Sequence, residues 1–277
     1  MSPTCKCSDF RIPEVTCYKK SHLVAIAQTW NSRNPDYKIK YISSLNKNVL
    51  WNELNIRFKN LSEDRWSDYI RDNKLKTQFA PIMPTEWISQ PNAWLSDQDI
   101  DNVLVAFQNK FRGFHFLKST PIDFDLKDKS GNCKISNLCK YTYAELAQKY
   151  TTFGIVFNTD PSDKPGQHWI SLFIQLKKGK IFFFDSTAEE PPTEVITLLR
   201  RFVSEGNKYF KTKKRIQIYK NDVQHQYKNT ECGIYCLYFL YFMLSIGDFS
   251  KLSSRRISDE EISKFRKFFY DERLLKN

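Results

Sequence analysis

The sequence predicts an α+β protein. Short apolar or alternating stretches between residues 152 and 185 are typical of strands, while apolar residues recur at helical spacing before and after that region. The strands and helices do not alternate in the regular order that a parallel α/β sheet requires. We therefore expect a sheet in the middle of the chain with helices on either side of it in sequence.

Composition limits the size and the surface of the protein. The 277 residues suffice for one large domain or two small ones. Lys and Arg outnumber Asp and Glu by 43 to 31, a net charge of +12, and this favours association with nucleic acid or another polyanion. The charge is spread out, with dense runs at 208–215 and at Arg255-Arg256, so a solvated surface is the simpler interpretation.

The seven cysteines are irregularly placed, and the first residues lack the apolar stretch of a signal peptide. We therefore expect a protein that is not secreted and whose thiols are reduced. Neither Cys5, Cys7 and Cys17 nor Cys133 and Cys139 have the C-x2-C spacing of a zinc site, so no metal is expected.

The first part of the chain predicts a helical arm. Residues 1–17 are polar and contain two prolines, which is typical of a loose tail. Two helices are expected at 23–30, capped by Ser21, and at 50–58, with an extended segment at 38–44 between them. Residues 61–76 are charged and read as an exposed helical segment. Prolines then cluster at 81, 84 and 91, so we place the boundary there, giving a module at 1–80 and a domain at 81–277.

The second domain begins with a helix and continues into the sheet. Ser96 followed by Asp99 resembles a capping box, and Thr142 with Glu145 marks another helix start. Strands are expected at 152–158, at 168–176 and at 180–185, the last two joined as a hairpin by Lys178-Gly179. A helix from 193 to about 205, a strand at 215–220 and a last helix opened by Ser258 complete the domain.

One stretch points to chemistry. Cys232 precedes an apolar run that ends at Ile246, about fifteen residues, which is too short to span a bilayer and indicates a buried helix. A thiol in the first turn of a helix meets unsatisfied N–H groups and the positive end of the helix dipole, which favour the nucleophilic thiolate. The alternative is a cysteine packed as a small apolar residue, which is our interpretation of Cys236.

A base and its orienting group follow from the predicted hairpin. His168 opens one strand and Asp185 ends the other, so pairing brings both to one rim of the sheet. Asp185 can then orient the imidazole while the other ring nitrogen faces the thiol of Cys232. The Gln226 amide and the Cys232 backbone N–H can serve as oxyanion donors. Taken singly, Asp185 is equally a residue that ends a strand and Gln226 a solvated loop amide.

The residues around His168, Asp185 and Cys232 resemble the motifs of a known protease family. Gly166-Gln-His168-Trp169, Phe184-Asp185-Ser186 and Gln226-x5-Cys232-Gly233 resemble the clan CE cysteine proteases, which include the proteases of SUMO and other ubiquitin-like proteins and the adenovirus endoprotease. The likeness covers about 84–275 and implies a papain-related core with a central mixed sheet flanked by helices. It implies Cys232 as nucleophile, His168 as base, Asp185 as orienter and Gln226 in the oxyanion hole.

Within the family, residues 152–160, 229–233 and 256–260 are most similar to the polyprotein proteases of African swine fever virus and giant DNA viruses. The African swine fever virus enzyme has Asn at the position of Asp185, so here the chain follows the cellular pattern. In SUMO proteases, tryptophans that match Trp94 and Trp169 cover a narrow channel for a Gly-Gly pair. Trp94 is equally interpreted as packing at a helix entrance.

The resemblance implies a thiol endopeptidase that cleaves after Gly-containing sites and matures virion polyproteins, located in the virion and in the host-cell cytoplasm. One alternative is removal of SUMO or another ubiquitin-like modifier, and another is a nucleic-acid-associated scaffold that uses a protease fold. No cofactor is expected, although DNA as activator or tether is an expectation from the adenovirus relative and the positive charge. The arm at 1–80 weakly resembles small nucleic-acid-binding modules, and a packing or substrate-gripping role fits it equally well.

Overall fold

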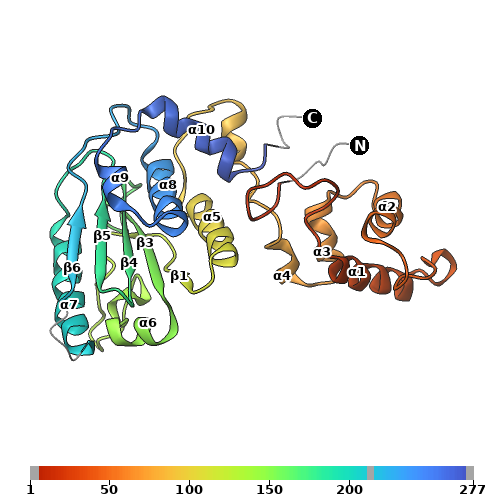
Figure 1. Cartoon of the computed structure of the whole chain (residues 1–277), viewed down its shortest axis with the longest axis horizontal. Coiled ribbons are helices and arrows are strands. Elements are labelled where there is room, and N and C mark those ends of the chain that lie inside the picture. Colours follow the sequence, from red (N-terminus) through yellow and green to blue (C-terminus); the bar gives the residue numbers. More distant parts are fainter. Residues whose placement is uncertain (1–5, 211–214, 273–277) are drawn as a thin grey trace. The chain divides into compact units, whose positions relative to one another are not determined.

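The structure, a computed structural model, describes residues 6–210 and 215–272 (Figure 1). The chain divides into two compact units. One runs to Met83 and takes in the chain from Phe268 onward, and the other is Pro84–Lys267. Residues 211–214 of the basic run at 208–215 lie outside the described residues.

The first unit is helical. Its elements are α1 (Lys20–Arg33), η1 (Pro35–Tyr37), α2 (Lys47–Arg57), η2 (Glu63–Arg65), α3 (Trp66–Tyr69) and α4 (Asn73–Lys76). Both expected helices are confirmed, but Ser21 does not cap the first one, because it lies inside α1, whose N-cap is Lys19. The side chain of Asn46 caps α2 by accepting from the backbone N–H of Val49. Tyr18, Leu50 and Trp66 are fully buried in a core that the two helices share.

Two expectations for this unit are wrong. The segment 38–44 is not extended. It comes after the 3-10 helix η1 and consists mostly of turns, and Tyr41 within it has a left-handed φ of 54°. The segment 61–76 is helical only in the short pieces η2, α3 and α4, and it is not exposed throughout, because Trp66 is completely buried. The average polarity of this charged stretch does not predict a buried indole, because one large side chain can supply the packing surface by itself.

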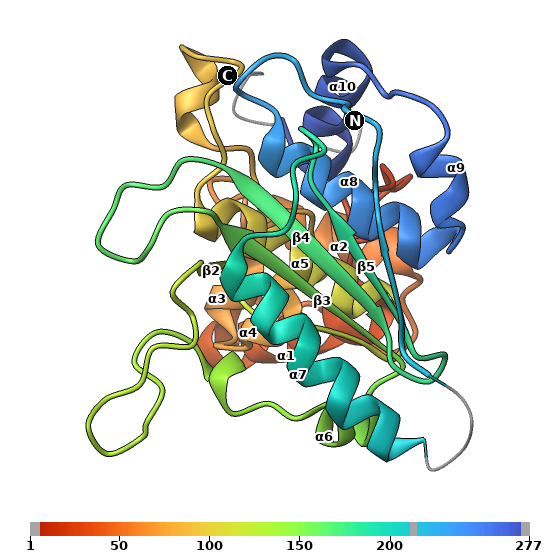
Figure 2. The same ribbon diagram turned by 90° about the vertical axis from the view of Figure 1, so that its left-hand side faces the viewer.

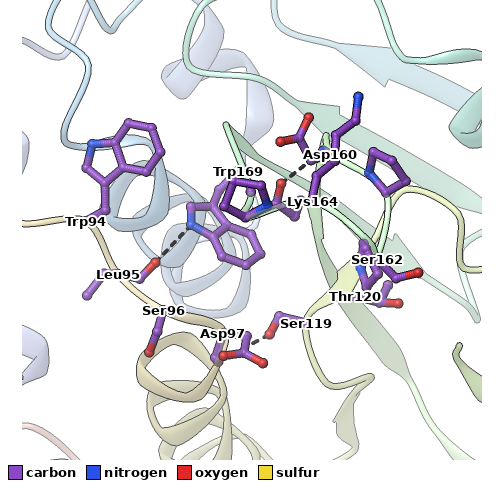
Figure 3. Close-up of a pocket in the computed structure, with 15 residues that line it drawn as sticks. Trp94, Leu95, Ser96, Asp97, Ser119, Thr120, Asp160, Ser162, Lys164 and Trp169 are labelled. Carbon is purple, nitrogen blue, oxygen red and sulfur yellow. Dashed lines mark hydrogen bonds between the residues drawn. The ribbon is translucent and has the colours of Figure 1, made fainter.

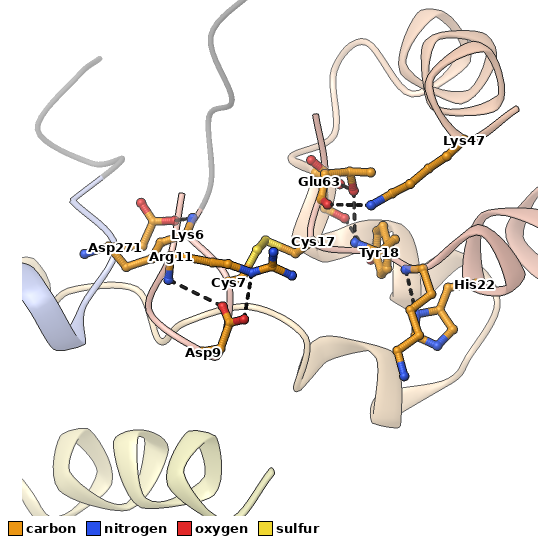
Figure 4. The surroundings of a disulfide bond; sticks show 12 residues. Lys6, Cys7, Asp9, Arg11, Cys17, Tyr18, His22, Lys47, Glu63 and Asp271 are labelled. Atoms are coloured by element: carbon orange, nitrogen blue, oxygen red, sulfur yellow. Dashed lines mark hydrogen bonds and ion pairs between the residues drawn. A yellow bond between two sulfur atoms is a disulfide. The ribbon is translucent and has the colours of Figure 1, made fainter. Parts of the chain in front are cut away.

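The expected loose tail is also wrong for its described part, residues 6–17. Cys7 pairs with Phe79 in a β-bridge and is bonded to Cys17 by a disulfide (Figure 4). A second disulfide joins Cys133 and Cys139, so the expectation of reduced thiols is wrong for these four cysteines. Cys5 lies outside the described residues. Spacing in sequence does not reveal such pairs, because the Cα atoms must come within bonding reach in the fold.

The end of the chain also differs from the expected division at 80/81. Asp271 forms a bridge with Ile82, and its carboxylate accepts from the backbone N–H of Lys6 at 2.6 Å (Figure 4). The backbone N–H of Met83 donates to the carbonyl oxygen of Asp271 at 3.1 Å. The residues from Phe268 therefore cluster with the first unit, whereas the sequence prediction assigned them to the second.

The second unit contains one mixed sheet. Its strands are β1 (Phe114–Phe116), β2 (Thr120–Pro121), β3 (Thr152–Asn158), β4 (Trp169–Gln175), β5 (Lys180–Phe184) and β6 (Gln217–Lys220). The order is β1-β3-β4-β5-β6, with β2 also paired to β3. The central pairs are antiparallel, whereas β1 and β2 run parallel to β3 and β6 runs parallel to β5. The expected hairpin and the expected α+β class are confirmed.

Helices cover both faces of this sheet. They are η3 (Thr85–Ile88), α5 (Asp97–Lys110), η4 (Asn137–Cys139), α6 (Tyr143–Lys149), α7 (Thr193–Tyr209), α8 (Cys232–Ser245), α9 (Phe249–Ser253) and α10 (Asp259–Phe269). Figure 1 shows α7 on one side of the sheet and α5 and α8 on the other, and Figure 2 shows α7 crossing the strands. Both expected capping boxes, at Ser96 and Thr142, are confirmed.

Alternation along the strands separates the two packing faces. Phe153, Ile155 and Phe157 of β3 pack in one core cluster with Leu198 and Phe202 of α7. On the other face, a Cβ added to Gly154 would meet Phe114 and a methyl of Leu240 in α8. The apolar helix α8 is therefore buried against the sheet, which fixes where its first residue lies. No helix among the described residues has the length and apolar character to cross a bilayer.

Candidate active site

His168 and Asp185 meet at one rim of the sheet, as the hairpin predicted. The register pairs Ser171 with Phe184, so the residue before β4 and the residue after β5 lie at the same end. The Nε2 atom of His168 lies 2.8 Å from Oδ1 of Asp185. The His168 side chain is 20% exposed and that of Asp185 only 4%, so the imidazole reaches solvent while its partner does not.

Two residues that the sequence analysis missed hold Asp185, one at its carboxylate and one at its backbone. Thr187 donates to Oδ1 of Asp185 from its backbone N–H at 2.9 Å and from its hydroxyl at 2.8 Å. Asn221, 1% exposed, accepts from the Asp185 N–H at 3.0 Å and donates to the Asp185 carbonyl at 2.6 Å. Because β5 and β6 are parallel, Asp185 and Asn221 follow neighbouring strand ends. The sequence predicted both strands, but their parallel pairing, which brings the two residues together, is known only from the structure.

Cys232 is the first residue of α8 and completes the group. Burial lowers the pKa of His168, but hydrogen bonds to Asp185 and Cys232 and the charges of both partners raise it, and the net pKa is about 10 instead of 6.5. Since Nε2 faces Asp185, Nδ1 is the ring nitrogen left for the sulfur. A protonated imidazole beside the sulfur is the cationic partner that a thiol nucleophile needs.

Cys236 lies one turn further along the same helix and is fully buried. Burial raises the pKa of its thiol well above the usual value. Such a thiol stays protonated and unreactive. The sequence interpretation of Cys236 as a core residue is confirmed, and it provides a control cysteine in the same helix.

Gln226 joins the site through Ser186, the residue after Asp185. The Ser186 hydroxyl donates to Oε1 of Gln226 at 2.7 Å, and Nε2 of Gln226 donates to the carbonyl of Lys228 at 2.5 Å. Because a carbonyl can only accept, this contact fixes which end of the amide is nitrogen. With 4% exposure, Gln226 is not a solvated loop amide. One hydrogen of the Gln226 amide is used in the bond to Lys228, and the second remains for an oxyanion. The role of Gln226 as an oxyanion donor stays a prediction.

Trp94 and Trp169 line one pocket of about 370 Å³ (Figure 3). Trp169 is 7% exposed and its indole N–H donates to the Leu95 carbonyl at 3.1 Å, which ties the segment before α5 to the start of β4. Trp94 is 44% exposed, so packing covers part of the residue and the rest stays accessible. The remaining walls come from the start of α5, from β2 and from the loop before β4, at 95–97, 119–121, 158, 160–162, 164–166.

The loop before His168 is held by Asn158. Its Oδ1 accepts from the backbone N–H groups of Asp160 at 3.0 Å and Gln167 at 3.1 Å. Gly166 has a φ of +96°, and a Cβ there would lie 2.5 Å from Nδ2 of Asn158. Glycine is therefore required where the chain turns into the catalytic strand.

The other described histidines lie outside the site. His225 is fully buried and its Nδ1 accepts from the Ile257 backbone N–H, while burial and Arg256 lower its pKa to about 4. His115 contacts Gln108 and stacks on Tyr150. In residues 6–210 and 215–272, no group of three or more His, Cys, Asp or Glu side chains could hold a metal ion.

A thiol at a helix N-terminus, an imidazole beside it and a carboxylate that orients the imidazole are the groups that cysteine proteases combine. Residues 145–277 match the model of the Ulp1 protease family, C-terminal catalytic domain.

Two curated relatives are viral. The chain is 29% identical, over 67% of its length, to a protein of Acanthamoeba polyphaga mimivirus named as a thiol protease, and it covers 59% of that protein. It is also 29% identical, over 62% of its length, to a cysteine protease of African swine fever virus, of which it covers 66%. The chain thus spans less than two thirds of either relative. The crystal structure of the African swine fever virus protease has the same fold, with a TM-score of 0.66 at 20% identity over 98% of this chain and 97% of that one.

Proposed function

We propose that this protein is a thiol endopeptidase. The observation that carries the proposal is the convergence of His168, Asp185 and Cys232 at one rim of the sheet, with a hydrogen bond of 2.8 Å between the first two and a pKa of about 10 for the imidazole. A structural ion pair would not need a cysteine at the first position of a buried helix.

The reaction follows from this arrangement. The Cys232 sulfur attacks the peptide carbonyl, and Gln226 with the Cys232 backbone N–H stabilises the oxyanion. The bond to the leaving amine breaks as the His168 imidazolium gives it a proton, which leaves a thioester and a neutral imidazole. His168 then takes a proton from water, the hydroxide attacks the thioester, and the Cys232 sulfur leaves as a thiolate beside the His168 imidazolium while the carboxylic acid is released.

We assign the cleavage to sites of the Gly-Gly-X type. Trp94 and Trp169 line one pocket, and because Trp169 directly follows His168, we place the substrate residues before the cut in it. Trp169 is held in place by the Leu95 carbonyl, so the wall is rigid. Flat indoles against an extended peptide leave room for glycine and exclude larger side chains by steric contact.

The setting that fits is maturation of virion polyproteins in a large DNA virus. The support is the likeness to proteins of mimivirus and African swine fever virus. The enzyme would then be present in virions and in the cytoplasm of the host cell, and its substrates would be viral precursors.

The test is cleavage of a Gly-Gly-X peptide by purified variants. Cys232→Ala and His168→Ala should abolish cleavage with the far-UV spectrum unchanged. Cys236→Ala, in the same helix, is the matched control and should retain cleavage. Undiminished cleavage by Cys232→Ala would refute the assignment.

Removal of a ubiquitin-like modifier is the second candidate. A further African swine fever virus relative, 29% identical over 62% of the chain, is named as a SUMO-1 cysteine protease. The same Gly-Gly chemistry serves both functions, so only the substrate separates them. Modifier-linked probes tested in parallel with capsid precursors decide, because the physiological substrate should be cut with the larger kcat/KM.

A further inference from the structure

A buried arginine connects the two walls of the site. Arg266 of α10 is 5% exposed, and its Nε lies 2.9 Å from Oε2 of Glu231, which is itself 2% exposed. Its Nη1 donates to the Ala93 carbonyl at 2.9 Å and its Nη2 to the Thr230 carbonyl at 3.0 Å. The guanidinium also lies over the Trp87 ring, 4.5 Å from the centroid.

The partners of Arg266 flank functional residues. Ala93 directly precedes Trp94, and Thr230 and Glu231 directly precede Cys232. Neither partner segment lies in a helix or strand, so side-chain contacts must set its position. A buried charge requires such complete pairing, because an unpaired ion in the interior is strongly unfavourable.

The rest of the contact set supports the same connection. Trp87 donates from Nε1 to the same Ala93 carbonyl at 3.2 Å. Asp259, at the start of α10, accepts from the backbone N–H groups of Tyr227 and Lys228. Helix α10 thus holds the loop that leads to the nucleophile at both of its ends.

We infer that Arg266 is a positioning residue that sets the distance between the Trp94 wall and the Cys232 sulfur. The planar guanidinium presents its N–H groups in a fixed fork, so the carbonyls of Ala93 and Thr230 cannot move independently. The inference rests on the proposed function only in naming Trp94 as part of the substrate channel. Arg266 touches neither substrate nor the reacting atoms.

The experiment compares two electrophiles on Cys232. Iodoacetamide is small and needs no channel, whereas a Gly-Gly vinyl sulfone must pass Trp94. Arg266→Lys keeps the charge but loses the fork. We expect its alkylation by iodoacetamide to stay within about 2-fold of wild type and its reaction with the vinyl sulfone to fall about 10- to 100-fold, since a shift of about 1 Å can reduce a rate 100-fold.

Arg201→Lys is the matched control. Arg201 of α7 likewise bonds two carbonyls, those of Leu138 and Cys139, and pairs with Asp125 at 3.5 Å, but it lies outside the catalytic group. This substitution should lower the Tm. It should leave unchanged the ratio of the two rates, which is the rate with the vinyl sulfone divided by the rate with iodoacetamide. If Arg266→Lys does not fold, Glu231→Gln keeps the fork contacts to both carbonyls and should lower the ratio less than 10-fold with a lower Tm.

Different results would refute the positioning role of Arg266 and the proposed endopeptidase function. A ratio in Arg266→Lys equal to that of Arg201→Lys, or an equal fall with both electrophiles, overturns the positioning role. If Arg266→Lys does not fold, a fall of 10-fold or more in Glu231→Gln overturns it too. Wild type that reacts with the vinyl sulfone but cleaves no Gly-Gly-X peptide contradicts the proposed function and leaves the ratio test in force.

Discussion

Replacing Asp185 by Asn should move the alkaline limit of peptide cleavage to lower pH. The substitution keeps an oxygen that can accept from His168 but removes the negative charge 2.8 Å from Nε2. Burial lowers the pKa of His168, and the contacts with Asp185 and Cys232 raise it to about 10. With Asn at 185, the Cys232 partner remains and the carboxylate contribution is lost.

The size of the shift follows from the distance. Unit charges about 4 Å apart at an effective dielectric constant of about 20 interact by about 4 kcal/mol, or about 3 pKa units. Opposite charges at such range shift measured values by about 1 to 3 units. Because the His168 side chain is 20% exposed, we take the middle of this range and expect a fall of about 2 units, from about 10 to about 8.

The assay is the pH dependence of kcat/KM on a Gly-Gly-X peptide between about pH 6 and 11. The imidazolium of His168 must donate a proton to the leaving amine, so cleavage is lost as pH rises through its pKa. Alkylation by iodoacetamide needs no such donor and should persist above that pH in both proteins. An alkaline limit that is unchanged in folded Asp185→Asn would refute the reasoning.

Three further predictions concern the supports of the site and the surface. Asn221→Ala removes the buried contacts to the Asp185 backbone and should cost about 1–3 kcal/mol of unfolding free energy in urea titrations and lower kcat; unchanged stability would contradict the bracing role. Gly166→Ala meets Asn158 at 2.5 Å with φ at +96°, so kcat/KM should fall with a loss of about 1–3 kcal/mol in stability, whereas Gly131→Ala, at φ +80° with open space around its Cβ position, should strain only its own loop and leave kcat/KM unchanged. If duplex DNA binds through the net charge of +12, affinity should fall by orders of magnitude between 50 and 200 mM salt; a nearly constant affinity would exclude electrostatic binding.

The sequence by itself determined the elements of the second unit and its site. Alternation predicted β3, β4 and β5, and the capping signatures at Ser96 and Thr142 marked two helix starts that the structure confirms. The hairpin then placed His168 beside Asp185, because the length of two strands about a known turn fixes which residues share a rim. These are local patterns, and local patterns are readable from neighbouring residues.

Only the tertiary structure decided contacts between distant segments. Sequence reading did not foresee Cys7 bonded to Cys17, Asn221 holding Asp185, or Arg266 joining Ala93 to Thr230. The last two join segments far apart in the chain, whereas the disulfide joins residues that are ten apart. Each contact needs atoms to approach closely, and packing of the core creates that approach. A buried guanidinium in an amphipathic helix looks in sequence like any surface charge, because its burial is set by what the rest of the fold places over it.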